Sequence, residues 1–411
     1  MRILYLHPNS WSGELHLLRK FVSLGHEVFA LEESRRGFGP SRWIADHFTD
    51  SGDAITTMWY DPGRGLEKIL TWPIDRIFKK SFDGRNIAHR ILLIRAAVRR
   101  FLPDVVVASD GFSYAIPAAF LRQLGGLKPR LIVSYIGGDI LDCPEAEVGK
   151  RRTRLTDWLI RSSIRIPDVL RPVSPLMRSI LLKDGADDSR VRVIPSHLVS
   201  DMSYLDNFFH RRREVSARIR ALHGISDSAP VIVTLGGNQK GKGLQILAEA
   251  WQGVLAKSPR ARWILCGPRS RWLEEGVLPI LSRLDLLSSV IVVGKLEMDG
   301  VFDHLAAADV HVNPSLCESL NMVTVEAAAV GTPTICSDGA GIAHWIRRFN
   351  AGRVVPSGEV SVLADAIISS FSSVALRAAW SDAGRHLALE FSLDRVSREL
   401  LNCFNSGSQT K

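Results

Sequence analysis

Two glutamates, Glu318 and Glu326, stand eight positions apart in a largely apolar stretch of the chain, CESLNMVTVE. A carboxylate in apolar surroundings costs free energy unless a partner or a ligand binds it. The apolar run that ends at Asn313 predicts a strand, and the small residues from Ala327 continue a helix that starts near Leu320. Glu318 then lies in the loop before the helix, and Glu326 lies about a turn and a half inside it.

The two carboxylates are expected to have separate binding roles. A pair of the glycosidase type holds both carboxyl groups astride one bond, which does not suit a loop residue and a mid-helix residue. The structural alternative is that one glutamate interacts favourably with the helix dipole and the other is exposed to solvent. That alternative is weak for Glu326, because Val323, Ala327 and Val330 share its face of the helix.

The start of this helix is a candidate anion site. Ser319 or Asn321 can cap it, and the first amides of a helix carry a partial positive charge. Because ligands of parallel sheets bind at the carboxyl ends of the strands, these amides are expected to face a ligand.

A glycine-rich loop, GGNQKGKG from Gly236 to Gly243, follows one expected strand and opens a helix. Its spacing nearly matches a P-loop, but Gly243 stands where that motif needs a Ser or Thr for Mg²⁺. No convincing acidic partner for a metal accompanies the loop, so a P-loop nucleotide hydrolase is disfavoured. Glycines still let backbone amides approach a phosphate, and Lys242 adds a full positive charge. The loop therefore predicts a phosphate site, with an ordinary tight turn as the alternative.

Two loops in the first half of the chain also follow expected strands. The loop from His7 to Glu14 holds one glycine, Gly13, which is too few for a dinucleotide fingerprint. The motif GxGxxG follows none of the expected strands, which argues against a dehydrogenase. The loop with Gly138 and Asp139 is expected to face the ligand, and a glycine-rich turn with an Asp cap is its alternative. No Asp-x-Asp occurs, so no divalent metal is expected.

Short apolar runs and helical periods alternate along the chain, and this pattern must position the candidate residues. Near-continuous apolar strands in such an alternation indicate parallel sheets covered on both faces. The periodicity lapses over residues 196–220 and restarts at Val231. The sequence therefore predicts an α/β protein with two Rossmann-like doubly wound domains that face a central cleft. Strands are expected at residues 2–7, 26–32, 104–109, 130–136, 169–173, 191–195, 231–235, 261–266, 289–293, 310–313, 333–336 and 352–355.

The net charge of +9 is concentrated in residues 1–215, which account for +8 of it. Solvated helix faces are one explanation, and attraction to an anionic membrane or an acidic substrate is the other. No recognised nucleic-acid-binding module occurs, so nucleic acid is not an expected partner.

The chain is expected in the cytoplasm. No uncharged apolar run approaches the ~18 residues of a membrane span, and the N-terminal apolar run is too short for a signal sequence. The five cysteines form no CxxC pair and are expected to be buried thiols, which suits a reducing compartment.

These residues together resemble the retaining glycosyltransferases of family 4, which have two Rossmann-like domains in the GT-B arrangement. The resemblance covers nearly the whole chain, and its core is an E-x7-E motif from Glu318 to Glu326. This motif stands in the block NPSLCESLNMVTVEAAAVGTPTI, after the GGNQKGKG loop. Further matches are VSPLMR from Val173, VIP from Val193, and DGAGI from Asp338.

The resemblance implies a nucleotide-sugar donor, UDP- or GDP-linked, and no cofactor or metal. Glu326 would hold the ribose hydroxyls, Glu318 would lie beside the transferred sugar, and Lys242 would bind the diphosphate. Glu318 and Lys242 are thus the expected catalytic residues. Further donor contacts are expected from glycine loops and a helix start, at Gly236, Gly237, Lys240, Leu320, Asn321, Met322 and Gly13. Gly138 and Asp139 are expected on the acceptor side.

Three positions depart from the family pattern. Gly237 stands where the family usually has an Arg, and Lys240 is the candidate that would replace its charge. Ile136 stands where the family often has a His, and Ser196-His197 replaces an Asn-Gly. These departures leave room for an inactive relative.

The resemblance also sets the expected domain limits. Residues 1–197 would form an acceptor-side domain and residues 198–385 a donor-binding domain. Residues 386–405 would form a C-terminal helix that packs back on the first domain, and residues 406–411 a disordered tail.

The expected function is transfer of a sugar, with retention, to an acceptor hydroxyl in cell-envelope, exopolysaccharide or glycolipid synthesis. The alternatives are a sugar-nucleotide epimerase of GT-B fold and a catalytically degenerate nucleotide-sugar-binding scaffold. Residues 71–74 and 77–82 mix apolar and cationic side chains as interfacial segments do. Peripheral contact with the inner face of an anionic membrane, and a glycan or lipid-linked acceptor, are therefore expected, with burial in the core as the alternative.

Overall fold

The computed structural model describes residues 1–6, 13–33, 55–60, 87–151, 153–236 and 239–405 of the 411-residue chain. The chain divides into two compact units. The first comprises Met1–Asp142, Gly149–Val199 and Leu393–Lys411, and the second comprises Cys143–Val148 and Ser200–Ser392. The chain therefore passes between the units at residue 199, and a short segment around residue 145 belongs to the second unit.

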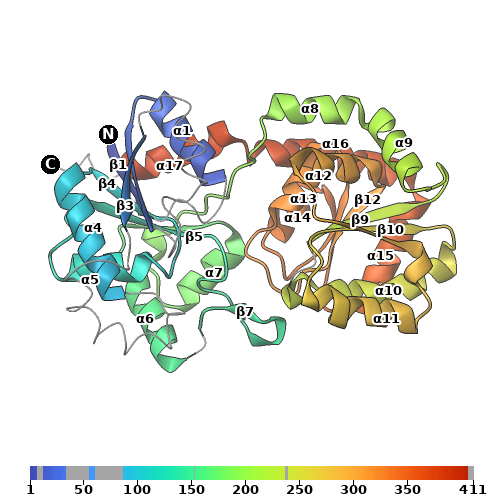
Figure 1. Cartoon of the computed structure of the whole chain (residues 1–411), viewed down its shortest axis with the longest axis horizontal. Helices are drawn as coiled ribbons and strands as arrows, with labels where there is room; N and C mark the ends of the chain where they lie inside the picture. Colours follow the sequence, from blue (N-terminus) through green and yellow to red (C-terminus); the bar gives the residue numbers. More distant parts are fainter. Residues whose placement is uncertain (7–12, 34–54, 61–86, 152, 237–238, 406–411) are drawn as a thin grey trace. The chain divides into compact units, whose positions relative to one another are not determined.

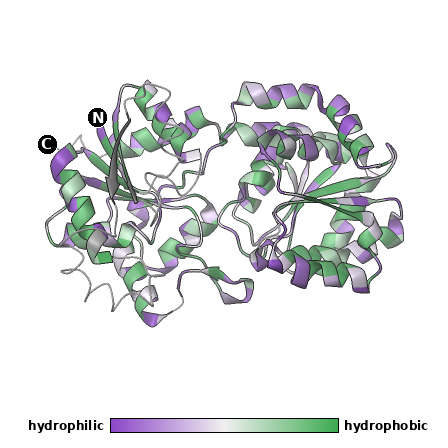
Figure 2. Cartoon of the chain, viewed as in Figure 1, coloured by the Kyte–Doolittle hydropathy of each residue, from purple (hydrophilic) through white to green (hydrophobic). Residues whose placement is uncertain are grey.

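The first unit is built on a parallel sheet with the strand order β3-β2-β1-β4-β5-β8. Its central strands contain near-continuous apolar runs, as burial on both faces requires, and Figure 2 shows hydrophobic residues concentrated in them. The expectation of a doubly wound parallel sheet is confirmed for this unit. The strands are β1 (Arg2–Leu6), β2 (Glu27–Glu33), β3 (Ile55–Tyr60), β4 (Val105–Ala108), β5 (Arg130–Tyr135) and β8 (Val169–Pro172).

Helices cover both faces of this sheet (Figure 1). The C-terminal helix α17 packs beside α1, where the rings of Phe21 and Phe404 lie 5.6 Å apart and Lys20 pairs with Asp394. The end of the chain thus contributes to the core of the first unit. The helices are α1 (Gly13–Ser23), α4 (Ile87–Phe101), α5 (Ala115–Gln123), α6 (Arg154–Ile164), α7 (Pro175–Lys183) and α17 (Leu393–Asn405).

The second unit repeats the architecture, with the strand order β11-β10-β9-β12-β13-β14. All its strand pairs are parallel, and the six strands expected from the sequence are confirmed. Trp251 and Trp263 are fully buried in its core, and their indole N–H groups donate to Ser289 and Thr234. The strands are β9 (Val231–Leu235), β10 (Arg262–Cys266), β11 (Val290–Gly294), β12 (Val310–Asn313), β13 (Thr334–Ser337) and β14 (Gly352–Val355).

The helices of the second unit form two layers (Figure 1). Helices α10 (Leu244–Lys257), α11 (Leu278–Arg283) and α15 (Val360–Ser372) pack on one face of the sheet. The other layer contains α12 and α13, which contact α9, α8 and α16. The remaining helices are α8 (Met202–His210), α9 (Arg212–Leu222), α12 (Met298–Ala307), α13 (Met322–Ala329), α14 (Ala343–Phe349) and α16 (Val374–Leu389).

The strands of the first unit differ from the expected ones at two places. Strand β3, which pairs with β2, was not expected from the sequence. The strand expected at residues 191–195 is absent, and only an isolated bridge joins Val191 to Leu170. The amides of Arg192 and Ile194 still donate to the carbonyls of Leu170 and Pro172. The carbonyls of Ile194 and Pro195 instead accept from the buried guanidinium of Arg171.

A small hairpin carries a disulfide that the sequence did not indicate. Strands β6 (Asp142–Cys143) and β7 (Val148–Gly149) flank the segment that belongs to the second unit. Cys143 is bonded to Cys317, which is 174 residues later. The expectation of five thiols is therefore wrong for these two cysteines, because spacing in the sequence does not reveal a partner so distant. The other three cysteines are buried and free.

Four further expectations concern membranes, the tail and the domain arrangement. No single helix in the described ranges is long and apolar enough to cross a membrane. The bent pair of helical segments Val360–Ser372 and Val374–Asn405 together has the length and composition of a span. The interfacial segments proposed at residues 71–74 and 77–82 and the tail at 406–411 lie outside the described residues. The cleft expected between the domains stays a prediction.

Candidate functional site

Two loops of the second unit meet at the carboxyl ends of neighbouring strands. Strands β9 and β12 are adjacent and parallel, so the loops that follow them leave the same edge of the sheet. The amide of Leu316 donates to the carbonyl of Gly241 at 2.8 Å. Gly243 has a φ of +67°, and a Cβ there would lie 1.9 Å from the carbonyl oxygen of Pro314. A side chain at this position would therefore force the two loops apart.

Glu318 is the centre of the polar contacts between these loops. Its Oε1 accepts an ion-paired hydrogen bond from the ammonium group of Lys242, which ends the short helix η3 (Lys240–Lys242). Its Oε2 accepts from the hydroxyl of Ser315 at 2.8 Å and from the amide Nδ2 of Asn321 at 2.8 Å. The side chains of Glu318 and Lys242 are only 17% and 27% exposed, so the pair is largely shielded from water.

The charge state of Glu318 follows from these partners. Burial raises the pKa of its carboxyl, but the charge of Lys242 and the hydrogen bonds from Asn321, Lys242 and Ser315 outweigh burial. The net pKa lies below its ordinary value, so Glu318 is ionised at neutral pH. An ionised glutamate cannot donate a proton, but it can accept hydrogen bonds from hydroxyl groups.

Helix α13 begins directly after this carboxylate, and the cap expected at Asn321 is confirmed. Asn321 has a φ of +86°, and its Oδ1 accepts from the amide of Thr324 at 2.8 Å. The same side chain therefore caps the helix through its oxygen and holds Glu318 through its nitrogen. Leu320 is buried, Met322 is partly buried, and the carbonyl of Leu320 accepts from Ile342. These contacts fix the backbone at the helix start, where unpaired amides favour an anion.

Glu326 lies one turn further along α13 and is partly buried. Burial raises the pKa of its carboxyl to about 7. Among the described residues it forms no ion pair or side-chain hydrogen bond. Glu326 is thus poised between its neutral and ionised forms near neutral pH, which distinguishes it from Glu318.

The remaining donor-side candidates lie on the loop after β9. Gly236 has a φ of +99°, and its amide donates to the carbonyl of Cys266 at 2.8 Å. Gly237 lies outside the described residues. Lys240 opens η3 and is partly exposed, without an ion pair in the described part of the chain. The hairpin segment packs against the same loop, since a Cβ at Gly241 would lie 2.6 Å from a methyl group of Val148.

The first-unit candidates occupy two separate loops. Gly13 begins α1, and a hydrogen bond joins its backbone to the buried His197. Gly138 is partly buried in the turn after β5. The carboxylate of Asp139 is buried and accepts from the amides of Gly111, Gly137 and Ile140. That arrangement suits a capped turn, and the acceptor-side roles of Gly138 and Asp139 stay predictions.

Two family models match the chain. Residues 14–197 match the glycosyl transferase 4-like domain, and residues 229–373 match glycosyl transferases group 1. Together the two matches cover well over half of the 411 residues. The chain belongs to the glycosyltransferases of the family 4 type.

Relatives and solved structures agree with this assignment to the glycosyltransferases. The chain is 24% identical over 413 residues to a Salmonella typhimurium protein named "Putative colanic acid biosynthesis glycosyltransferase WcaL", with 94% of each chain covered. A glycosyltransferase of Rickettsia africae has a similar fold, with a TM-score of 0.74, 16% identity, and coverage of 100% of this chain and 99% of that one. Anabaena HepE, solved with UDP and glucose, gives a TM-score of 0.72 at 16% identity over 99% of this chain and all of HepE. The expected GT-B fold class is thereby confirmed.

This glycosyltransferase also uses residues that the sequence did not single out. The Ser315 hydroxyl, which donates to Glu318, also lies 2.6 Å from the Oδ1 of Asn313. The buried His311 lies on β12 below them, and burial lowers its pKa to about 3, so it stays neutral. Ser315 and Asn313 belong to the NPS run before the motif, whose turn-forming composition was the available signal. In the described ranges no group of three or more His, Cys, Asp or Glu side chains could hold a metal.

Proposed function

We propose that this glycosyltransferase moves a sugar from a nucleoside-diphosphate sugar to an acceptor hydroxyl. One observation carries the proposal: Lys242 and the ionised Glu318 form a shielded pair at the start of α13, where two loops converge. A cation and a helix start suit a diphosphate, and a carboxylate suits sugar hydroxyls.

The donor would extend along α13. Lys242 and the amides of Leu320, Asn321 and Met322 would contact the diphosphate and sugar hydroxyls. Glu326, which is without a partner among the described residues, would accept from the ribose hydroxyls. The seven residues between the two glutamates would then separate the sugar end of the donor from its ribose end.

The chemical step breaks the bond between the anomeric carbon of the sugar and the diphosphate oxygen. Negative charge grows on the leaving diphosphate, and preorganised amides with Lys242 stabilise it. We propose retention, in which the acceptor oxygen bonds to the same face of the sugar and the leaving phosphate oxygen takes the acceptor proton. Glu318 is ionised, so its role is to orient the sugar. The proposal assigns charge neutralisation to these groups, without a metal.

The acceptor is proposed to be a glycan or a lipid-linked glycan of the cell envelope. The relative named for colanic acid biosynthesis supports a polysaccharide. The positive charge of residues 1–215 supports binding of the cytoplasmic protein to an anionic membrane surface.

A donor screen tests the proposal. Purified protein is incubated with several UDP- and GDP-sugars, with and without membrane extract, and sugar incorporation and free nucleotide are measured. Transfer that requires the extract is the expected result, and Lys242→Ala should abolish most of it. Lys257→Ala, at the exposed end of α10, is the matched control and should transfer as the unaltered protein does.

Two other outcomes would contradict the proposal. Rearrangement of the donor sugar without an acceptor would indicate an epimerase. Donor binding without any turnover, over all donors and extracts, would indicate a scaffold.

A further inference from the structure

A cavity of the second unit lies apart from the candidate donor-binding residues. Its volume is about 890 Å³, and it is bordered by α9, by the start of α16 and by the segment between α12 and β12. Lys242, Glu318 and Glu326 are not among its lining residues. A volume of this size suits a small molecule.

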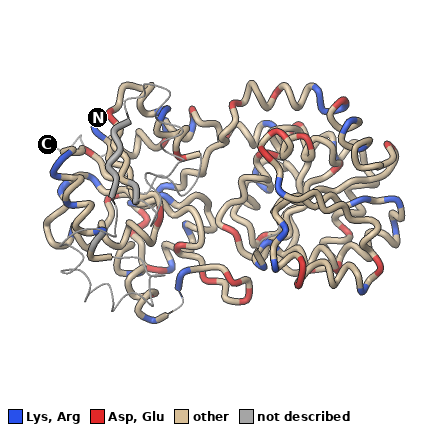
Figure 3. The backbone as a smooth tube through the Cα atoms, viewed as in Figure 1, with Lys and Arg blue, Asp and Glu red and all other residues tan. Residues whose placement is uncertain are grey.

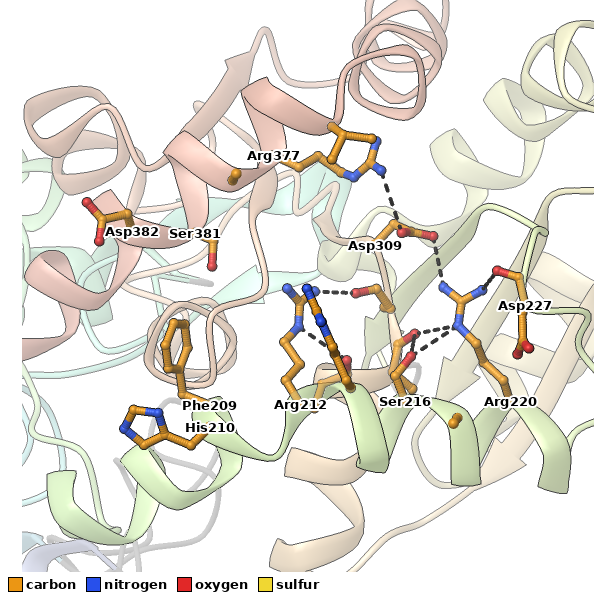
Figure 4. A pocket seen from close by; sticks show the side chains of 17 residues that line it. Phe209, His210, Arg212, Ser216, Arg220, Asp227, Asp309, Arg377, Ser381 and Asp382 are labelled. Carbon is orange, nitrogen blue, oxygen red and sulfur yellow. Dashed lines mark hydrogen bonds and ion pairs between the residues drawn. The ribbon is translucent and has the colours of Figure 1, made fainter.

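Arginines from two opposite helices line this cavity. Figure 4 shows Arg212 and Arg220 on α9, Arg377 on α16, and Asp309 between Arg220 and Arg377. Arg213 also lines it from the surface of α9, a helix with four arginines and one glutamate, and Figure 3 shows that positive residues predominate along this helix. Long cationic side chains from separate elements thus converge on one space.

The guanidinium groups of Arg212 and Arg220 are held in place by backbone carbonyls. Arg212 donates to Ala306 at 3.3 Å and to Ala308 at 2.7 Å. Arg220 donates to Ala307 and Ala229, at 3.2 and 2.8 Å. A ligand would therefore not have to order these two side chains itself.

Positive charge exceeds negative charge inside the cavity. Asp309 pairs with Arg220 at 3.0 Å, whereas its distance to Arg377 is 3.9 Å. Burial lowers the pKa of Arg212, and Arg220 and Arg377 lower it further against the attraction of Asp309. Three guanidinium groups therefore share one close carboxylate. The other two lining carboxylates, of Asp227 and Asp382, are on exposed residues.

Several donors remain for a ligand. Among the described residues, Arg212 donates through Nε and Nη2 and its Nη1 has no acceptor, and Arg213 forms no ion pair. Nη1 of Arg377 donates to the carbonyls of Ser370 and Phe371, whereas its Nη2 has no hydrogen bond in this part of the chain and lies 3.9 Å from Asp309. The first turn of α16, at Val374, adds the partial positive charge of a helix start.

We propose that this cavity binds a phosphate group on a small molecule, through Arg212, Arg213 and Arg377. Guanidinium groups match phosphate oxygens in bidentate geometry. The apolar side chains of Phe209 and Val374 border the space that the rest of the molecule would occupy. The phosphate could belong to a soluble sugar phosphate or to a lipid headgroup. The site uses none of the donor-binding residues, so the inference does not depend on the proposed function.

Binding of inorganic phosphate to the full chain tests this site. The Lys242→Ala variant is used throughout, so that the donor site does not add to the signal, and affinity is measured by calorimetry. One phosphate site is expected, and Arg213→Glu and Arg377→Gln should each weaken it at least about tenfold. Arg283→Glu, at the exposed end of α11, is the matched control and should leave the affinity unchanged.

Two further arms identify the source of the phosphate. Glucose 6-phosphate is the soluble probe, and phosphatidylcholine vesicles with and without phosphatidic acid are the lipid probe. Binding of either probe that Arg213→Glu abolishes supports the site. Absence of phosphate binding, or phosphate binding that neither Arg213→Glu nor Arg377→Gln weakens, overturns the inference. Arg213 is exposed, so its replacement tests the site even if Arg377→Gln fails to fold.

Discussion

The carboxylate of Glu318 is held by three side chains from two loops, and this arrangement gives it a role different from that of Glu326. Lys242, Ser315 and Asn321 all donate to Glu318, so its negative charge is stabilised before any ligand arrives. Glu326 lacks such donors among the described residues, and burial keeps its pKa high. Glu318 and Glu326 thus lie in two different electrostatic environments, although they are only eight positions apart.

Glu318→Gln should mainly lower turnover. The substitution keeps the size of the side chain but removes the charge that would orient the transferred sugar. We expect kcat to fall roughly 10²-fold with little change in the donor KM, a magnitude typical for one preorganised contact to the reacting group. Steady-state kinetics at varied donor concentration measure both constants. An unchanged kcat with a raised KM would show that Glu318 serves ground-state binding instead.

The raised pKa of Glu326 predicts a pH-dependent stability. The folded protein retains the proton to about pH 7, whereas the unfolded chain releases it near the ordinary value of 4.5. The contribution of Glu326 to the free energy of unfolding is therefore fully present below pH 4.5 and is lost as the pH rises through 7. Glu326→Gln removes this loss, so the variant should gain up to about 3 kcal/mol over the unaltered protein between pH 5 and pH 8. Denaturant unfolding at several pH values measures the difference, and parallel pH profiles would contradict the assignment.

Part of this site could be predicted from residue types and spacing. The cap at Asn321 was predicted because an Asn stands just before an apolar helical run. Binding roles for the two glutamates were predicted because their sequence neighbours are largely apolar. The pairing of Lys242 with Glu318 could not be predicted, because it depends on two loops that are 76 residues apart in sequence and meet only through the strand order. Asp139 looked like a ligand-facing residue, yet its oxygens accept from three backbone amides, which spacing alone does not reveal.

At the scale of elements, the loops after β9 and β12 are kept in contact by Gly243. Gly243→Ala should separate them, because the new Cβ would meet the carbonyl of Pro314 and the φ of +67° disfavours any side chain. We expect a loss of more than about 1 kcal/mol in stability and a weaker donor affinity. Thermal unfolding and donor titration measure these two effects.

Gly253→Ala provides the control for that substitution. Gly253 lies within helix α10, and a Cβ there would make an ordinary contact of 3.5 Å with Ala364. Alanine should therefore raise stability by about 0.5–1 kcal/mol and leave donor affinity unchanged. Equal effects of the two alanines would show that the clash with Pro314 does not occur.

Most strands were predictable because buried parallel strands contain near-continuous apolar runs. The expectation failed where other interactions decided the backbone. Residues 191–195 read as a strand, but Arg171 takes two of their carbonyls. Strand β3 (Ile55–Tyr60) lies at the edge of its sheet, where one neighbour instead of two weakens the demand for an apolar run. Apolar periodicity therefore predicts central strands better than edge strands.

At the scale of the whole molecule, two segments join units to which their sequence neighbours do not belong. The C-terminal helix α17 belongs to the first unit, and Cys143–Val148 belongs to the second. Both arrangements depend on contacts between residues that are distant in sequence. The resemblance to family 4 glycosyltransferases indicated that the last helix packs on the first unit. Nothing in the sequence indicated that Cys143–Val148 belongs to the second unit.

The disulfide between Cys143 and Cys317 gives the last prediction. Protein purified without reductant and then unfolded should show three reactive thiols, and Cys143→Ser should show four because the partner thiol is released. The bond closes a loop of 174 residues, so chain entropy predicts that it stabilises the fold by up to about 5 kcal/mol. A reductant should lower the stability of the unaltered protein but not that of Cys143→Ser. Five reactive thiols in the unreduced protein would contradict the pairing, and equal sensitivity of both proteins to the reductant would contradict its contribution to stability.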